Sequence, residues 1–230
     1  MFDPADWPVI RLTLLVGAIS VGVSLVPGIL LGWLFARWNH PLRALAQGIT
    51  MLPLVLPPVV TGYLLLMLLG RKSWLGASLE SITGLRIAFS TTACVVAAAV
   101  VGFPLLVESI RLSILGMDQR LESVSRSLGR SRLQTFLRVN LPLCLPGILS
   151  GAVLSFARAL GEFGATIVLA GDIEGTTRTI PLAVYGHLYA VDGEAAAGRL
   201  VLVSVLISLV ALMAAAWLQQ RQRRRMEDQK

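Results

Sequence analysis

Residues 12–35 read LTLLVGAISVGVSLVPGILLGWLF, a run without a single charged side chain. A helix needs about 20 apolar residues to cross the hydrocarbon core of a bilayer, so this run predicts a membrane-spanning helix. The apolar run is too long for the core of a cleavable signal peptide, and Asp3 and Asp6 rather than cations precede it. We therefore expect this segment to be retained as the first span.

The rest of the chain repeats this pattern. Of its 230 residues, 55% are hydrophobic and 14% are charged, whereas soluble domains carry roughly 25% charged residues. So few charges cannot cover a soluble surface. The chain is predicted to be an all-α integral membrane protein, a single transmembrane domain over 1–230. Its five predicted spans lie at about 10–36, 48–70, 87–110, 141–171 and 199–219, with a long loop at about 111–140.

The distribution of Lys and Arg predicts the orientation, because cytoplasmic loops are enriched in these residues. Five spans place the termini on opposite sides. With the N-terminus outside, 13 of the 20 cations fall inside: Arg37, Arg43, Arg111, Arg120, Arg126, Arg130, Arg132, Arg138, Arg221, Arg223, Arg224, Arg225 and Lys230. Arg71 and Lys72 fall in an outer loop, against this trend, but the outer segments also hold acids such as Asp172 and Asp192. We expect a periplasmic N-terminus and a cytoplasmic C-terminus.

The net charge of +7 is explained by the same loops meeting anionic lipid headgroups, so no nucleic-acid partner is expected. The basic run at 221–225 is read as a stop-transfer anchor rather than an interaction tail. His40 and His187 stand alone, and no metal cluster, phosphate-binding loop or nucleophile–base pair is evident. We expect no catalytic site, no metal and no cofactor.

Proline and glycine residues recur within the predicted spans. The cluster Leu52-Pro-Leu-Val-Leu-Pro-Pro58 predicts a kinked second span, because each proline removes a backbone hydrogen bond. Such breaks serve either packing geometry alone or a transport pathway lined by broken helices. Small residues allow helices in lipid to pack closely, and they recur at Gly17, Gly22, Gly28, Gly32, Gly147 and Gly151.

The 111–140 loop carries the signature of a short amphipathic helix. Asp118 is a good N-cap, and Glu122 in the first turn suits the helix dipole. Leu121, Val124 and Leu128 follow at i, i+3 and i+7, which places them on one apolar stripe.

A glycine turn is predicted to end this helix. Gly129 suits the left-handed position after a helix, and Ser131 with Gln134 forms a capping box that starts the next helix. A helix lying on the membrane face is one reading of this segment. A docking element for a soluble partner explains the sharp turn better.

The residues of this loop resemble the cytoplasmic signature of ABC-importer permeases. That signature reads Glu-Ala-Ala, three residues, Gly, nine residues, Ile, one residue, Leu-Pro. Gly129 and Leu141-Pro142 match its glycine and its final pair at the same spacing. The chain departs from it with Ser-Val-Ser at 123–125, Val139 for Ile, and its only acid one position early, at Glu122.

Three further stretches resemble the molybdate permease subunits of ABC importers, and sulfate permeases share the second of them. They are Leu52–Gly62, Phe156-Ala-Arg-Ala-Leu-Gly-Glu-Phe-Gly-Ala165 and Thr177-Arg-Thr-Ile-Pro-Leu-Ala-Val-Tyr185. The resemblance implies a type I ABC importer permease bundle of about five spans with a short cytoplasmic coupling helix. It also implies a homodimer of this chain, two cytoplasmic ABC ATPase subunits and a periplasmic oxyanion-binding protein. The implied substrate is molybdate, with tungstate and sulfate as the related tetrahedral dianions.

Two groups of candidate site residues follow. The predicted ATPase-coupling residues are Leu121, Glu122, Ser123, Val124, Ser125, Arg126, Leu128, Gly129, Leu141 and Pro142. Arg158 and Glu162, inside the fourth span, either pair with each other structurally or belong to a gate. Hydroxyl groups suit an oxyanion pathway by type and depth, and the candidates are Thr61, Ser155 and Thr166.

Two alternatives of other classes stay open at this point. A membrane-embedded enzyme would need a cluster of acids or histidines inside the spans, where only Glu162 clearly lies. A passive channel would need no cytoplasmic ATPase. That reading would leave the turn at Gly129 unexplained.

Overall fold

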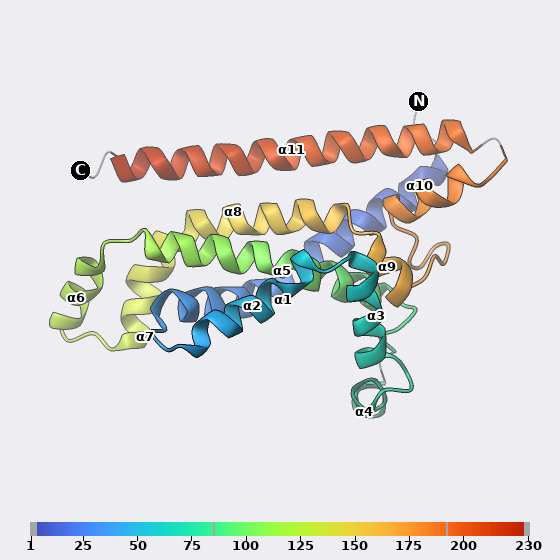
Figure 1. Ribbon diagram of the computed structural model, residues 1–230. Helices are drawn as coiled ribbons and strands as arrows, with labels where there is room; N and C mark the ends of the chain where they lie inside the picture. Colours follow the sequence, from blue (N-terminus) through green and yellow to red (C-terminus); the bar gives the residue numbers. More distant parts are fainter. Residues whose placement is uncertain (1–3, 85, 192, 228–230) are drawn as a thin grey trace.

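The computed structural model describes residues 4–84, 86–191 and 193–227, and every element in them is helical. Figure 1 shows long helices lying side by side in an elongated bundle. Asp3, Asp192 and Lys230, which entered the charge distribution, lie outside the described residues, as do the side chains of the basic run at 221–225.

Three helices form the centre of the bundle. They are α1 (Trp7–Arg37), α5 (Thr91–Leu115) and α8 (Leu141–Leu160), and each packs against the other two. Helix α5 is the most enclosed, with Leu106 and Ile110 fully buried. Its burial explains why its sequence is apolar on nearly every side from Ala93 to Val107.

Glycines set how closely these helices approach. A Cβ atom on Gly28 would lie 2.8 Å from the side chain of Leu106, and one on Gly32 would lie 2.7 Å from Ile110. On α8, Gly147 and Gly151 face the side chains of serines on α5 in the same manner. Gly22 is the exception, since nothing lies within 4 Å of its Cβ position.

The predicted kink of the second span is a sharp break. The chain bends by 113° between helix α2 (Leu42–Val55) and helix α3 (Pro58–Leu69). Leu56 and Pro57 each precede a proline, and both are extended, with ψ of 144° and 132°. A proline pushes the residue before it out of the helical region, so two in succession give two extended residues and the bend.

The fourth predicted span, 141–171, is not continuous. Helix α8 ends at Leu160, residues 161–163 are non-helical, and α9 (Gly164–Leu169) begins a new direction. Gly161 ends the first helix, and the Glu162 side chain accepts a hydrogen bond from the Ala165 backbone N–H at the start of the second. The side-chain hydrogen bond of Glu162 thus stabilises a new helix start within a run whose apolar composition predicts one continuous span.

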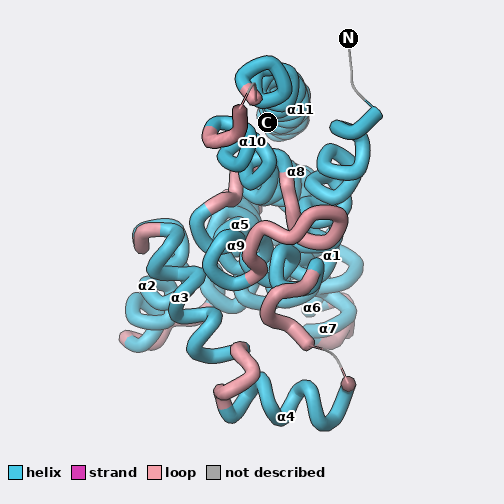
Figure 2. Tube along the Cα trace, turned by 90° about the vertical axis from the view of Figure 1, so that its right-hand side faces the viewer, coloured by secondary structure: helices cyan, strands magenta, loops and turns pink. Residues whose placement is uncertain are grey.

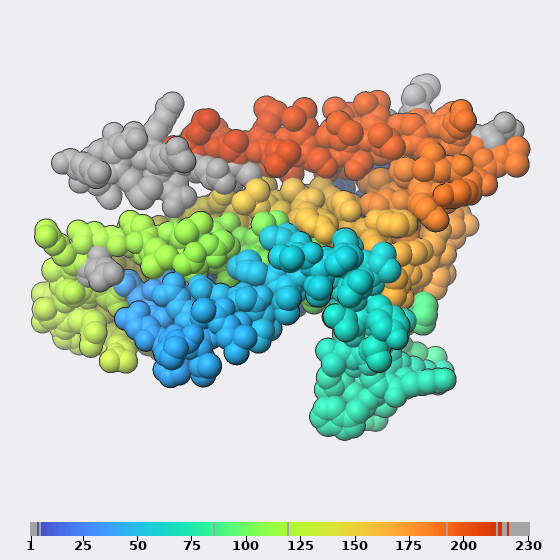
Figure 3. All heavy atoms as spheres, viewed as in Figure 1, coloured from blue at the N-terminus to red at the C-terminus, as the bar shows by residue number. Residues whose placement is uncertain are grey.

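The remaining helices lie at the periphery. Helix α10 (Ile180–Leu188) and helix α11 (Glu194–Glu227) pack together, and α11 also covers α8. The third span runs from Thr91 to Leu115 rather than from about 87 to 110, so the loop predicted to begin at 111 begins after residue 115. Between the second and third spans, α4 (Trp74–Thr83) projects away from the bundle (Figures 2 and 3). A 3₁₀ turn, η1 (Pro4–Asp6), precedes α1.

The length and composition of the helices bear out the predicted fold class. Four of them are long and apolar enough to cross a membrane, or five if the bent pair α2–α3 counts as one span. The short helices of the 111–140 loop lie at one end of the bundle, the end toward which α11 runs, whereas α9 and α10 lie at the other (Figure 1).

Candidate functional site

The loop between α5 and α8 folds as its sequence predicts. Helix α6 (Gln119–Ser127) has Asp118 as its N-cap, and the Asp118 carboxylate accepts a hydrogen bond from the Arg120 backbone N–H at 2.9 Å. Glu122 lies in the first turn and Arg126 in the last, as favours a helix dipole.

Gly129 forms the predicted turn. Its φ of +81° lies in the left-handed region. The Gly129 N–H donates to the Arg126 carbonyl at 3.0 Å, and the Arg130 N–H donates to the Ser125 carbonyl at 3.4 Å. These two bonds define a Schellman motif, which satisfies the last carbonyls of α6. Nothing lies within 4 Å of a Cβ built on Gly129, so only the backbone conformation demands glycine here.

Ser131 starts the next helix, α7 (Arg132–Thr135), through the predicted capping box. Its hydroxyl accepts from the Gln134 N–H at 3.2 Å, and the Gln134 side chain accepts from the Ser131 N–H at 3.1 Å. Local hydrogen bonds therefore fix both ends of α6, at Asp118 and at Gly129, as well as the start of α7.

The apolar stripe of α6 faces away from the bundle. Leu121, Val124 and Leu128 are 48%, 58% and 74% exposed. Ser123 and Arg126 are exposed as well, and they line a shallow hollow next to Gly129. Because the chain leaves these apolar side chains uncovered, α6 presents a surface suited to a partner.

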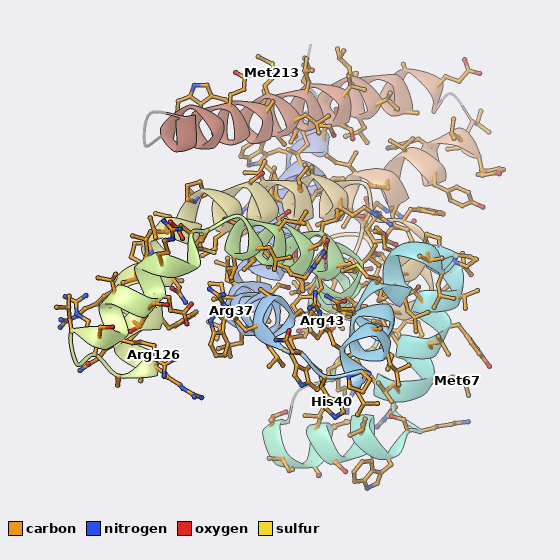
Figure 4. The ribbon with its side chains drawn as sticks, turned by 60° about the vertical axis from the view of Figure 1, so that its left-hand side comes forward. Arg37, His40, Arg43, Met67, Arg126 and Met213 are labelled. Atoms are coloured by element: carbon orange, nitrogen blue, oxygen red, sulfur yellow. The ribbon has the colours of Figure 1, made fainter. Side chains whose placement is uncertain are left out.

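Glu122 and Ser125 face inward instead. Ser125 is 4% exposed, and its hydroxyl lies 3.1 Å from the Thr135 hydroxyl of α7. The Glu122 carboxylate lies 2.6 Å from the Arg37 guanidinium at the end of α1. Figure 4 labels Arg37 and Arg126 and shows them on separate elements at this end. In the sequence, Arg37 is recognisable only as one of the cations that predict the orientation. Local spacing cannot reveal a partner 85 residues away.

Helix α7 continues into α8 through a π-helical turn, η2 (Phe136–Asn140). The Leu141 N–H donates to the Phe136 carbonyl, five residues back. Pro142 has no N–H to donate to the carbonyl of Arg138, and its ring crowds that carbonyl, which explains the local widening. Leu141 and Pro142 are thus the first residues of α8 and are linked to α6 through η2 and α7.

The second candidate group surrounds the break between α8 and α9. Arg158 Nη1 lies 2.9 Å from Glu162 Oε2, so the predicted pair forms, although across a helix end rather than along one helical face. Glu162 is 3% exposed. Its Oε1 atom accepts from Ala165, but within the described residues its Oε2 atom accepts no well-aligned hydrogen bond. The Arg158 and Glu162 side chains are therefore close enough for an ion pair, but their geometry does not meet the angles of a hydrogen bond.

The three hydroxyl candidates separate in the structure. Thr61 on α3 and Thr166 on α9 are buried at 4% and 2% exposure, where α3 packs on α9. The Thr61 hydroxyl has no hydrogen-bond partner among the described residues. Ser155 lies elsewhere: it is buried on α8 against Gly102 of α5, which favours a packing role.

The segment 171–179, which leads into the third resembling stretch, is held by its own polar residues. The Thr177 hydroxyl donates to the Gly171 carbonyl and accepts from the Ile173 N–H, both at 2.9 Å. Arg178 donates to Asp172 at 2.8 Å. This hydrogen bond raises the pKa of the Arg178 guanidinium, so Arg178 stays charged. The loop before α10 is thereby fixed in shape.

Residues 28–228 match the family model described as "Binding-protein-dependent transport system inner membrane component". The chain is 45% identical over 223 residues to the molybdenum transport system permease protein ModB of Escherichia coli K12, covering 97% of both chains. It is 44% identical over 217 residues to ModB of Haemophilus influenzae, covering 94% of this chain and 95% of the relative.

The fold has a solved counterpart. The inward-facing MetNI methionine ABC transporter contains a chain that superposes with a TM-score of 0.70. The alignment covers 96% of this chain and 99% of that chain, at 17% sequence identity. At this identity the likeness concerns the arrangement of helices alone.

Proposed function

The chain belongs to the family of binding-protein-dependent transport system inner membrane components, and we propose that, as the permease of an ABC importer, it carries molybdate. Membership in this family decides against the channel and enzyme alternatives. The chain is a transport subunit and not itself catalytic, and it acts with an ATPase and a binding protein.

The observation that carries the proposed substrate is the likeness to molybdenum permeases, at 45% identity over nearly the whole of both chains. The substrate class is a tetrahedral dianion, which molybdate shares with tungstate and sulfate. The sulfate permease protein CysW of Synechococcus elongatus is also similar, at 40% identity over 177 residues, but the alignment covers only 76% of this chain. Molybdate is therefore the preferred assignment.

The proposed assembly is a homodimer of this chain with two cytoplasmic ATPase subunits and a periplasmic oxyanion-binding protein. Helix α6 of each copy docks one ATPase subunit through Leu121, Val124 and Leu128, whose exposure supports this role. Helix α2 has no buried residue, and it forms part of the outer surface together with α3 (Figure 3). Such an apolar face requires either lipid or the second copy of the chain to cover it.

The proposed orientation places α6 and the end of α11 in the cytoplasm and the N-terminus in the periplasm. The positive-inside distribution supports it. The geometry is consistent with it, because α6 and the end of α11 lie at the same end of the bundle (Figure 1).

The proposed transport step is alternating access. Closure of the ATPases on ATP moves both α6 helices and shifts the bundle between inward-facing and outward-facing states. The motor acts only through its differential affinity for these two states. The proposed gate is the junction of α3 with α9, where Thr61, Thr166 and the Arg158–Glu162 pair lie. A cation already paired with a carboxylate does not trap the dianion, and release is as necessary as binding.

The experiment that tests the substrate is competition uptake. Proteoliposomes holding the permease, its ATPase and its cognate binding protein receive labelled molybdate with excess sulfate or tungstate. We expect ATP-dependent molybdate uptake that tungstate inhibits strongly and sulfate inhibits weakly. Uptake of labelled sulfate with higher efficiency than molybdate would assign the chain to sulfate instead.

A further inference from the structure

The acid of α6 is turned toward its own chain. Arg37 Nη2 lies 2.6 Å from Glu122 Oε2, and the two side chains are 25% and 27% exposed. A charge-assisted hydrogen bond of this length between two mostly buried groups is among the stronger polar contacts in proteins. Arg37 is the last residue of α1, so the pair connects the end of a central helix directly to α6.

The same turn of α1 contacts the start of α8. Trp33 lies one helical turn before Arg37, and its ring packs edge-on against Phe136 of η2, with ring centroids 5.6 Å apart. Residues at i and i+4 share one face of a helix. The last turn of α1 therefore contacts α6 through Arg37 and the segment leading into α8 through Trp33.

A second contact joins α6 to that same segment. The Ser125 and Thr135 hydroxyls lie 3.1 Å apart, and both residues are buried. Glu122 and Ser125 are three positions apart, so they share the inner side of α6. Helix α6 is thus attached at two points, to α1 by an ion pair and to α7 by a hydroxyl pair.

We infer that Glu122 is a positioning residue whose partner is Arg37 rather than the ATPase, and that the Arg37–Glu122 pair couples displacement of α6 to α1. The inference rests on the proposed docking of an ATPase on α6. The exposed stripe of α6 supplies the docking surface, whereas the inward acid supplies the connection to the transmembrane bundle. Without the pair, α6 keeps its own caps and its contact with Thr135 but loses its direct attachment to α1.

The test uses the whole complex in proteoliposomes. The variants are Arg37→Met, Glu122→Gln, Arg37→Lys and the charge exchange Arg37→Glu with Glu122→Arg. Three quantities are measured: ATPase subunit retained on the purified permease, ATP hydrolysed, and molybdate transported per ATP. Arg138→Met serves as the matched control, because Arg138 is an exposed cation at the same end of the bundle.

Arg37→Met and Glu122→Gln should retain the ATPase subunit but lower molybdate transported per ATP on the order of tenfold, a typical coupling factor between two sites. Arg37→Lys and the charge exchange should restore most of this ratio, which a role in folding alone would not predict. Arg138→Met should leave it unchanged.

Three results would overturn the inference. One is a wild-type transport ratio in Arg37→Met, and another is failure of the charge exchange to raise the transport ratio above that of Glu122→Gln. Loss of the ATPase subunit from Glu122→Gln but not from Arg37→Met would likewise assign Glu122 to direct contact with the ATPase. The docking proposal is tested separately by Leu128→Asp. Retention of the ATPase subunit by that variant would refute docking on α6, whatever the Arg37 variants do.

Discussion

Gly129 gives the sharpest test of the turn that ends α6. Its φ is +81°, and a Cβ atom there would meet nothing within 4 Å. The penalty for Gly129→Ala therefore comes only from the left-handed backbone, which costs an L-residue roughly 1–2 kcal/mol. Since 1.4 kcal/mol is tenfold in an equilibrium constant, the equilibrium constant for forming the turn should fall about 5- to 30-fold relative to glycine.

The substitutions at Gly129 form a graded series. Asparagine tolerates the left-handed region best and should be mildest, followed by alanine and then the β-branched valine. Proline should be most severe, because it fixes φ near −65° and removes the N–H that donates to the Arg126 carbonyl. If only the turned form docks, the apparent affinity for the ATPase subunit falls by up to the same factor as the population of the turn.

The assay is titration of the purified permease with its ATPase subunit, together with ATP-driven molybdate uptake. Gly84→Ala is the matched control: Gly84 also follows a helix with φ of +69° and open space around its Cβ position, but it lies after α4, far from α6 in the fold. We expect normal membrane insertion in every variant and weakened binding only at Gly129. Wild-type affinity and uptake in Gly129→Pro would refute the assignment of this turn to ATPase docking.

Two further predictions concern the junction of α3 with α9. A Cβ on Gly62 would lie 2.7 Å from the Ala165 Cα atom, so Gly62→Ala should destabilise the purified protein by about 1–3 kcal/mol. Gly48→Ala, where nothing lies within 4 Å, should be neutral or stabilising, and equal melting temperatures for the two variants would contradict the packing. Glu162→Gln keeps an acceptor for the Ala165 N–H, so thermal melting should show it to be less destabilising than Glu162→Ala, which loses both contacts and leaves Arg158 unpaired. The reverse order would show that the cap contributes little.

The sequence predicted those features that local chemistry determines. Asp118, Gly129 and the Ser131–Gln134 box each act within a few residues, so α6, its turn and the start of α7 could be placed correctly. The break after α8 was missed, although its signal is also local. Gly161 and Gly164 flank Glu162 there, but the apolar composition on both sides favoured one continuous span.

The contacts between distant segments could not be predicted. The pair of Arg37 with Glu122 depends on where α1 ends relative to α6, and that position follows from the packing of α1 on α5. The same holds for Asp6, whose carboxylate pairs with Arg199 at 3.0 Å across 193 residues. A single sequence does not reveal such pairs. Each charged residue fits the positive-inside rule or a helix-capping rule equally well, whichever residue it pairs with in the fold.

The positions of the helix breaks relative to α6 indicate how a displacement would travel. Helix α8 is 20 residues long, which corresponds to about 30 Å. One of its ends is linked to α6 through η2 and α7, and the other is the break at Gly161. Beyond the break, Gly164 packs directly on Pro58 at the start of α3, itself the point where the second span bends. Both interruptions therefore meet at the far end of a continuous helix whose near end is linked to α6. Packed helices transmit displacement, whereas breaks absorb changes in φ and ψ, so the junction of α3 with α9 is where movement of α6 should open or close the pathway.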